Sequence, residues 1–157
     1  MARTTSAFAM IGGAIMLASA ACSVATSEGI YMGQAADALR AYRVQELTEW
    51  SEVGSLQSGK LGENEIKRDT MHLGAGRRLG ILASCDDDCG DLDLSVEDAN
   101  GFTMEREADD SAEYPFVQFE TTEDGIYVVR VNMEQCSATT CFYTYLLLET
   151  RPGGNGE

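Results

Sequence analysis

Histidine is almost absent from this sequence, since His72 is the only one among 157 residues. A Ser-His-Asp triad needs a nucleophile beside such a residue, and no Gly-x-Ser-x-Gly elbow is present to provide one. Because the chain has 26 acidic residues, some pair of carboxylates can always be named, so the sequence gives no support to a glycosidase pair. We therefore expect no enzymatic activity and place His72 at a strand end facing solvent.

Basic residues are also scarce, with 11 lysines and arginines and a formal net charge of -15. Nucleic acid and an anionic membrane surface would both repel such a chain, so neither is expected as a partner. Cations are the natural counter-species, and acidity also keeps an exported protein soluble. Gly74 and Gly76 are not followed by the Gly and Lys of a phosphate loop, so nucleotide binding has no support.

The N-terminal apolar run is too short to span a membrane as a helix. The uncharged segment from Ala7 to Leu17 has the length of a signal-peptide h-region instead. Arg3 supplies the charge that precedes it, and small residues follow as far as Ala25, as a cleavage site requires. We therefore predict that residues 1–25 are a signal peptide and that the mature protein is periplasmic or secreted, with no transmembrane segment.

The cysteine count bears on the cleavage site, because an odd thiol is reactive in an oxidising compartment. The chain has five cysteines, and a cut after Ala25 removes Cys22 and leaves four that can all pair. The alternative is an outer-membrane lipoprotein, in which Cys22 becomes the lipidated first residue and four thiols again remain. The usual lipidation signal has Leu three residues earlier, where this chain has Ser19.

About 130 residues remain after such a cut, which is a common size for one domain. Apolar residues recur at spacings of three and four between Ile30 and Tyr42, and they predict a helix over roughly Thr26 to Trp50. Clustered glycines and serines end it, so residues 26–54 are interpreted as a helical arm whose apolar stripe packs on the main fold.

Beyond residue 54 the pattern changes to short strands separated by turn residues, which is typical of a β-sandwich. About eight strands between residues 55 and 150 predict a mainly β, jelly-roll-like antiparallel β-sandwich preceded by the helix. Residues 151–157 have nothing to pack and are expected to form a disordered tail. The expected strands lie near Ser55–Gly59, Thr70–Leu73, Leu79–Ser84, Asp91–Glu97, Phe102–Arg106, Pro115–Glu120, Gly125–Met133 and Phe142–Glu149.

The clearest alternation of period two lies in the segment Asp91–Glu97. Leu92, Leu94 and Val96 occupy one face, and acidic or polar residues occupy the other. Successive side chains of a strand point to opposite faces, so the apolar residues are expected in the core and the acids in water. Asn100-Gly101 then predicts a tight hairpin turn, because this dipeptide readily adopts positive φ angles.

Several motifs occur together in this region. They are Cys85-Asp86-Asp87-Asp88-Cys89-Gly90-Asp91-Leu92-Asp93-Leu94, then Asn100-Gly101, Gly125-Ile126-Tyr127-Val128-Val129-Arg130-Val131 and Cys136-Ser137-Ala138-Thr139-Thr140-Cys141. In this order they resemble the bacterial pre-peptidase C-terminal (PPC)-like domain, and more narrowly its small exported subgroup with paired cysteines. The resemblance implies a jelly-roll β-sandwich, bound calcium in some members, and a non-catalytic module usually attached to secreted hydrolases.

The four cysteines of the mature chain allow three disulfide connectivities or a zinc site. We favour Cys85 with Cys89 and Cys136 with Cys141, because each pair brackets a short polar loop and an exported chain is oxidised by default. Each loop must turn back on itself, since bridged Cα atoms lie within about 7 Å. The bridges are therefore expected mainly to fix the shape of the two loops.

Carboxylates concentrate in the first of these loops. Asp86, Asp88, Asp91 and Asp93 occupy alternate positions, which project the same way in an extended segment, and hard cations prefer oxygen ligands. These four aspartates are the candidate calcium ligands, and solvated turn-forming aspartates are the alternative.

Two functions remain open on these observations. The first is an exported non-catalytic β-sandwich module that binds calcium, a glycan or a protein partner through its acidic loops. The second is an envelope lipoprotein or periplasmic structural factor with a solvated acidic surface, in which Cys22 carries the lipid. An inhibitor or chaperone of a separately encoded protease is a third option.

Overall fold

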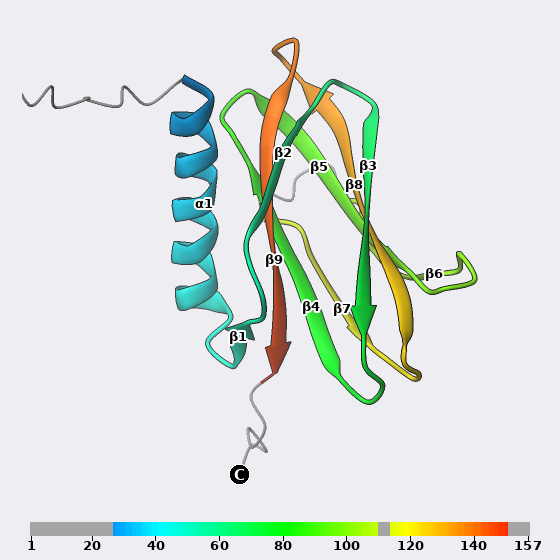
Figure 1. The fold of residues 1–157 in the computed structure, drawn as a ribbon. Helices are drawn as coiled ribbons and strands as arrows, with labels where there is room; N and C mark the ends of the chain where they lie inside the picture. Colours follow the sequence, from blue (N-terminus) through cyan, green and yellow to red (C-terminus); the bar gives the residue numbers. More distant parts are fainter. Residues whose placement is uncertain (1–26, 110–113, 151–157) are drawn as a thin grey trace, which may run out of the picture.

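The computed structural model of the chain describes residues 27–109 and 114–150 (Figure 1). The predicted signal peptide with Cys22 and the predicted tail at 151–157 lie outside these ranges. Helix α1 (Ser27–Glu46) comes first, and the described strands follow it in this order: β1 (Trp50–Glu52), β2 (Gln57–Leu61), β3 (Glu65–Leu73), β4 (Arg78–Cys85), β5 (Cys89–Glu97), β6 (Thr103–Glu107), β7 (Phe116–Glu120), β8 (Gly125–Cys136) and β9 (Cys141–Thr150).

The strands form two antiparallel sheets that face each other. Sheet A has the order β1-β9-β4-β7, with β2 also pairing with β9, and sheet B has the order β3-β8-β5-β6. This arrangement confirms the predicted β-sandwich with an N-terminal helix. The described residues contain nine strands rather than eight, because the short β1 pairs with the end of β9.

The core lies between the two sheets and is filled by alternate residues of the long strands. Leu92, Leu94 and Val96 of β5 are at most 1% exposed and pack there, as their period-two spacing predicts. From sheet A, Tyr143 and Tyr145 of β9 point into the same core. Every second side chain of β9 therefore belongs to the sandwich interior, and those between them face the helix.

Helix α1 lies along the outer face of sheet A beside β9 (Figure 1). Leu39 of the helix packs in a second apolar cluster with Leu146, Leu148 and Trp50, all fully buried. The expectation that the apolar stripe packs on the main fold is met by this contact. No described helix is long and apolar enough to cross a membrane.

The helix ends at Glu46, and the prediction that it continues to Trp50 is wrong. The backbone N–H of Trp50 donates to the carbonyl of Leu47 in a turn, and Trp50 then pairs with Thr150 of β9. Trp50 is 1% exposed, and its ring meets Phe116 edge-on at 5.4 Å between centroids. Burial of this indole and strand pairing outweigh the helical spacing, so the predicted arm over 26–54 divides into a helix and the first strand of the sandwich.

The prediction that the acids of β5 face water is also wrong. Asp93 and Glu97 point away from the core as expected, yet they are 6% and 5% exposed. Arginines of the same sheet cover them: Arg106 of β6 donates to Asp93 at 2.9 Å, and Arg68 of β3 and Arg130 of β8 both donate to Glu97. Because β5 lies inside sheet B, between β8 and β6, long side chains reach it from both sides.

Candidate functional site

Both predicted disulfides are present, and they lie next to each other at one end of the sandwich. Cys85 and Cys89 bridge with Cα atoms 5.9 Å apart, and Cys136 and Cys141 with Cα atoms 5.8 Å apart. Cys89 is paired opposite Cys136 across β5 and β8. The two loops thus form one doubly bridged end, which we call the disulfide end (residues 85–89 and 136–141).

A hydrogen-bonded contact ties the two loops of the disulfide end together. Ser137 donates to the carbonyl of Asp88 from both its backbone N–H and its hydroxyl, each at 2.8 Å. The backbone N–H of Asp86 donates to the carbonyl of Phe142 at 3.0 Å. These hydrogen bonds hold the acidic loop in a defined shape.

Asp86 differs from the two acids that follow it. Asp87 and Asp88 are exposed, whereas Asp86 is 8% exposed and its buried Oδ1 has no hydrogen-bond partner. Burial raises the pKa of Asp86 above its ordinary value, although the backbone N–H of Phe142 acts in the opposite direction. The carboxylate lines a pocket of about 180 Å³ between α1 and the disulfide end.

The four candidate calcium ligands do not converge in the structure. Asp86 lies in the pocket beside α1 on the outer side of sheet A, whereas Asp91 and Asp93 lie on the outer face of sheet B, where Arg106 holds Asp93. Among the described residues, no group of three or more His, Cys, Asp or Glu side chains is placed to hold a metal ion. Calcium binding by this chain stays a prediction, which needs a direct measurement.

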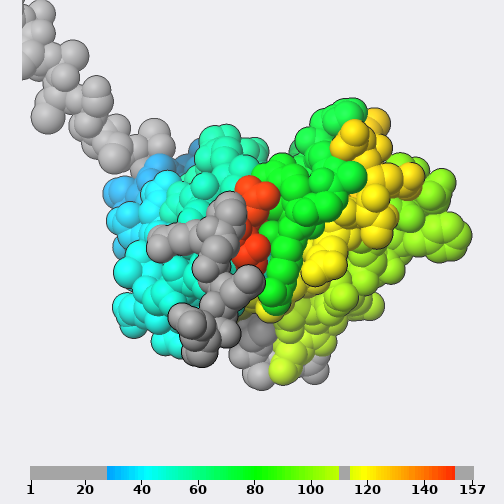
Figure 2. Space-filling view, turned by 90° about the horizontal axis from the view of Figure 1, so that it is seen from below, coloured from blue at the N-terminus to red at the C-terminus, as the bar shows by residue number. Residues whose placement is uncertain are grey.

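A cleft that the sequence did not reveal lies between the edges of the two sheets. It has a volume of about 450 Å³ and opens where the edge of sheet A meets the edge of sheet B. The space-filling view shows it as a hollow between the segment around β1 and β2 and the green end of β3, with β9 at its base (Figure 2). The lining residues come from three segments: Val53, Gly54, Ser55 and Gln57, then Asp69, Thr70, Met71, His72 and Leu73, then Tyr145 and Leu147.

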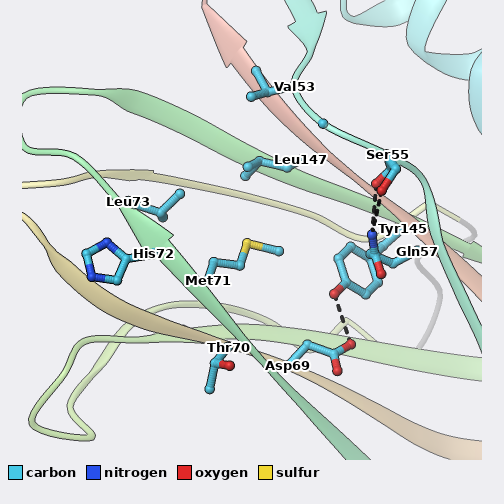
Figure 3. A pocket seen from close by; sticks show the side chains of 11 residues that line it. Val53, Ser55, Gln57, Asp69, Thr70, Met71, His72, Leu73, Tyr145 and Leu147 are labelled. Atoms are coloured by element: carbon cyan, nitrogen blue, oxygen red, sulfur yellow. Dashed lines mark hydrogen bonds between the residues drawn. The ribbon is translucent and has the colours of Figure 1, made fainter.

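One end of the cleft is polar (Figure 3). The Tyr145 hydroxyl donates to Oδ2 of Asp69 at 2.9 Å, and Lys67 lies 3.2 Å from Oδ1 of the same carboxylate. Gln57 donates to the carbonyl and hydroxyl oxygens of Ser55 at the rim. Burial and the hydrogen bond to Asp69 raise the pKa of Tyr145, so the phenol stays a neutral donor.

The other end of the cleft contains Leu73 and His72 (Figure 3). His72 is exposed near the end of β3, as predicted. None of the hydrogen bonds found for the described residues joins it to a serine, a cysteine or a carboxylate. Sequence reasoning missed the cleft because strand pairing brings its three segments together, and the only local signal was Gly54, interpreted there as a helix stop.

Comparisons with known proteins concern the fold alone. No family model and no curated protein matches the chain. One similar solved structure is PliG of Aeromonas hydrophila, a periplasmic inhibitor of g-type lysozyme, at 12% identity over 61% of this chain and 85% of that chain, with a TM-score of 0.46. Another is the pre-peptidase C-terminal domain of a Bacillus anthracis collagenase, at 11% identity over 60% and 89%, with a TM-score of 0.48.

The second of these structures is a domain of the kind that the sequence motifs resemble.

Proposed function

We propose that this chain is an exported, non-catalytic binding module that holds an extended segment of a protein partner in the cleft between β2 and β3. The observation that carries the proposal is that both walls of the cleft are sheet edges. An extended segment binds such an edge through its backbone and places alternate side chains in adjoining pockets.

The first wall is an interruption in the edge of sheet A. β1 ends with Glu52 opposite Leu148, and β2 begins with Gln57 opposite Tyr145, so residues 53–56 lie opposite only two residues of β9. Gly54 has a φ of 80°, a left-handed conformation that glycine adopts without strain and that lets the chain leave the strand direction. The strand pairing is thereby interrupted after Val53, whose backbone N–H still donates to the carbonyl of Leu147 at 2.8 Å.

The second wall is the outer edge of sheet B. Within the described ranges, β3 pairs with β8 on one side and is the first strand of its sheet. The opposite side of an edge strand carries unpaired backbone N–H and C=O groups, which readily pair with another extended chain. Residues 69–73 of β3 line the cleft, so an added segment would lie along its mouth.

The lining selects the chemistry of the segment. Met71, Leu73 and Leu147 offer apolar contact for the stem of a long side chain, and Asp69 with its phenol partner offers charge and hydrogen bonding at the far end. Lysine and arginine combine an apolar stem with a cationic head. A chain with a net charge of -15 also attracts a basic segment over a longer range.

The proposal is tested by selecting binders from a displayed library of random peptides. The affinity of each selected peptide for the protein is then measured. The variant Gln57→Trp plugs the cleft at its rim, and Gln118→Trp on the exposed face of β7 is its control. Loss of a well-packed contact of this kind weakens binding by about tenfold or more. We expect that loss for Gln57→Trp and unchanged binding for Gln118→Trp; equal binding by both, or a library without binders, would refute the proposal.

Export rests on the sequence of residues 1–25 and is tested separately. We expect the intact mass of the exported protein to match a chain that starts after Ala25 with two disulfides, and to rise by four hydrogens on reduction. A diacylated Cys22 would instead establish the envelope lipoprotein. The non-catalytic assignment is supported by the isolation of His72, and a turnover abolished by His72→Ala in a folded protein would overturn it.

A further inference from the structure

A second site lies at the other side of sheet A, away from the cleft. It is the pocket of about 180 Å³ between α1 and the acidic loop, and it shares no lining residue with the cleft. Helix α1 contributes Gln34, Ala35 and Ala38, the disulfide end contributes Cys85, Asp86 and Asp87, and Ser84 and Tyr114 complete the lining.

The carboxylate of Asp86 is the unusual feature of this pocket. Its side chain belongs to a residue that is 8% exposed, and its Oδ1 atom is buried without a hydrogen-bond partner. Buried polar atoms in folded proteins are nearly always hydrogen-bonded, and leaving a charged one unpaired costs free energy. A ligand group that donates a hydrogen bond to the carboxylate of Asp86 would recover part of that cost.

Other buried acids of the chain show how it satisfies a carboxylate by itself. Asp93 is bound by Arg106, and Glu97 by Arg68 and Arg130. No ion pair within the described residues reaches Asp86. The hydroxyl of Ser84 in the pocket wall donates instead to the carbonyl of Ala35 at 3.0 Å.

We propose that this pocket binds the cationic head of a lysine or arginine side chain presented by a partner protein, with Asp86 as its counter-ion. The pocket volume is several times the roughly 30 Å³ that one water molecule occupies in the liquid. It can therefore hold a head group together with part of its stem. Ala35 and Ala38 supply small apolar walls for the methylenes, and an aromatic ring such as that of Tyr114 attracts a cation.

The chemistry of the pocket favours an organic cation over a calcium ion. Calcium takes six to eight oxygen ligands, whereas this pocket offers two carboxylates, of which Asp87 is exposed. The same pocket also lacks any described cluster of three metal-ligating side chains. One buried carboxylate with an oxygen that accepts no hydrogen bond suits a single ammonium or guanidinium donor.

The test uses the mature protein, purified after export, and three small probes. N-acetyl-lysine methylamide and N-acetyl-arginine methylamide carry the cation, and N-acetyl-norleucine methylamide is the uncharged control. The methyl resonances of Ala35 and Ala38 report occupancy of the pocket. We expect saturable shifts with both cationic probes and none with the norleucine probe.

Three variants localise the binding. Asp86→Asn keeps the shape of the side chain and removes its charge, so the affinity should fall about tenfold or more, as loss of one charge-assisted hydrogen bond implies. Asp87→Asn removes the same charge from an exposed position of the same loop and should change the affinity less than about twofold. Ala38→Leu fills the pocket with a residue that favours a helix and should abolish binding.

Stability measurements separate a binding role from a structural one. Because Oδ1 of Asp86 is buried without a hydrogen-bond partner and no ion pair compensates the charge, Asp86→Asn should not lower the thermal midpoint, while it does lower probe affinity. Equal loss of affinity in Asp86→Asn and Asp87→Asn would show attraction to the general acidity and overturn the proposal. Binding that survives Ala38→Leu, or calcium alone producing the same methyl shifts and excluding the probes, would overturn it as well. None of these outcomes bears on the peptide segment proposed for the cleft.

Discussion

Two core tyrosines couple the stability of this sandwich to alkaline pH. Tyr143 and Tyr145 are 3% and 1% exposed. Burial, with a smaller contribution from the charge of Asp69, raises the pKa of Tyr143 from 10.0 to about 12. Burial and the hydrogen bond to Asp69 raise the pKa of Tyr145 further. Both phenols are therefore neutral in the folded state over a range in which they ionise in the unfolded chain.

The sign and size of the effect follow from these shifts. A raised folded-state pKa means that stability is fully present below about pH 10, the pKa of an unfolded tyrosine, and is lost as the pH rises through 10 toward the folded value. At about pH 11 each phenol has largely ionised in the unfolded chain alone, which lowers the free energy of unfolding by about 1.4 kcal/mol. The two tyrosines together give a loss of about 3 kcal/mol.

Urea unfolding at pH 9 and pH 11, followed by the fluorescence of Trp50, measures this loss. Tyr143→Phe should reduce it by about half, since one of the two phenols is removed. Tyr31→Phe changes a residue that is 41% exposed on α1 and should leave the loss as it is in the wild type. A Tyr143→Phe protein that loses as much stability as the wild type between the two pH values would refute the reasoning.

Three further predictions concern the strands, the bridges and the acids. A Cβ at Gly59 would lie 2.6 Å from the Tyr143 hydroxyl, so Gly59→Ala should lower the free energy of unfolding in urea by about 1–3 kcal/mol. Gly33 lies in a helix with open space around it, so Gly33→Ala should raise the free energy of unfolding by about 0.5–1 kcal/mol. Reducing both disulfides should lower the free energy of unfolding by about 4 kcal/mol, the sum of two short loops in the chain-entropy model; an unchanged urea midpoint would contradict it. If Asp91 and Asp93 bind calcium, the thermal midpoint in excess calcium should be higher than in chelator at matched ionic strength. The double variant Asp91→Asn with Asp93→Asn should show no such difference. Equal midpoints of the wild type in the two conditions would refute that site.

Features that depend on neighbouring residues were predictable from the sequence. The period-two pattern of Leu92, Leu94 and Val96 placed them in the core, because strand geometry alone decides which side chains share a face. The two disulfides were predictable for a similar reason, since each closes a loop of a few residues. The sandwich as a whole followed from the number and spacing of the strands.

Features that depend on the order of strands in the sheets were not predictable. The short strand at Trp50 exists because the end of β9 lies beside it, and the helical spacing before it gave no sign of that pairing. The cleft joins residues 53–57 to residues 69–73 and to β9, and local spacing does not tell which strands become edges. Long-range pairing of this kind is decided by the whole fold rather than by any one segment.

The acids of the Asp-Leu-Asp-Leu strand show how this limit affects functional interpretation. Alternation correctly assigned Asp93 and Glu97 to the outer face, but the arginines that bury them come from β3, β6 and β8. These two carboxylates therefore form ion pairs within sheet B. Binding of an external cation by the acidic segment does not depend on them. Asp86 is equally buried and has no arginine among the ion pairs of the described chain. A buried acid without an ion-pair partner in its own protein is the one for which an external cation has most to offer, and this separates Asp86 from the buried Asp93 of the same motif.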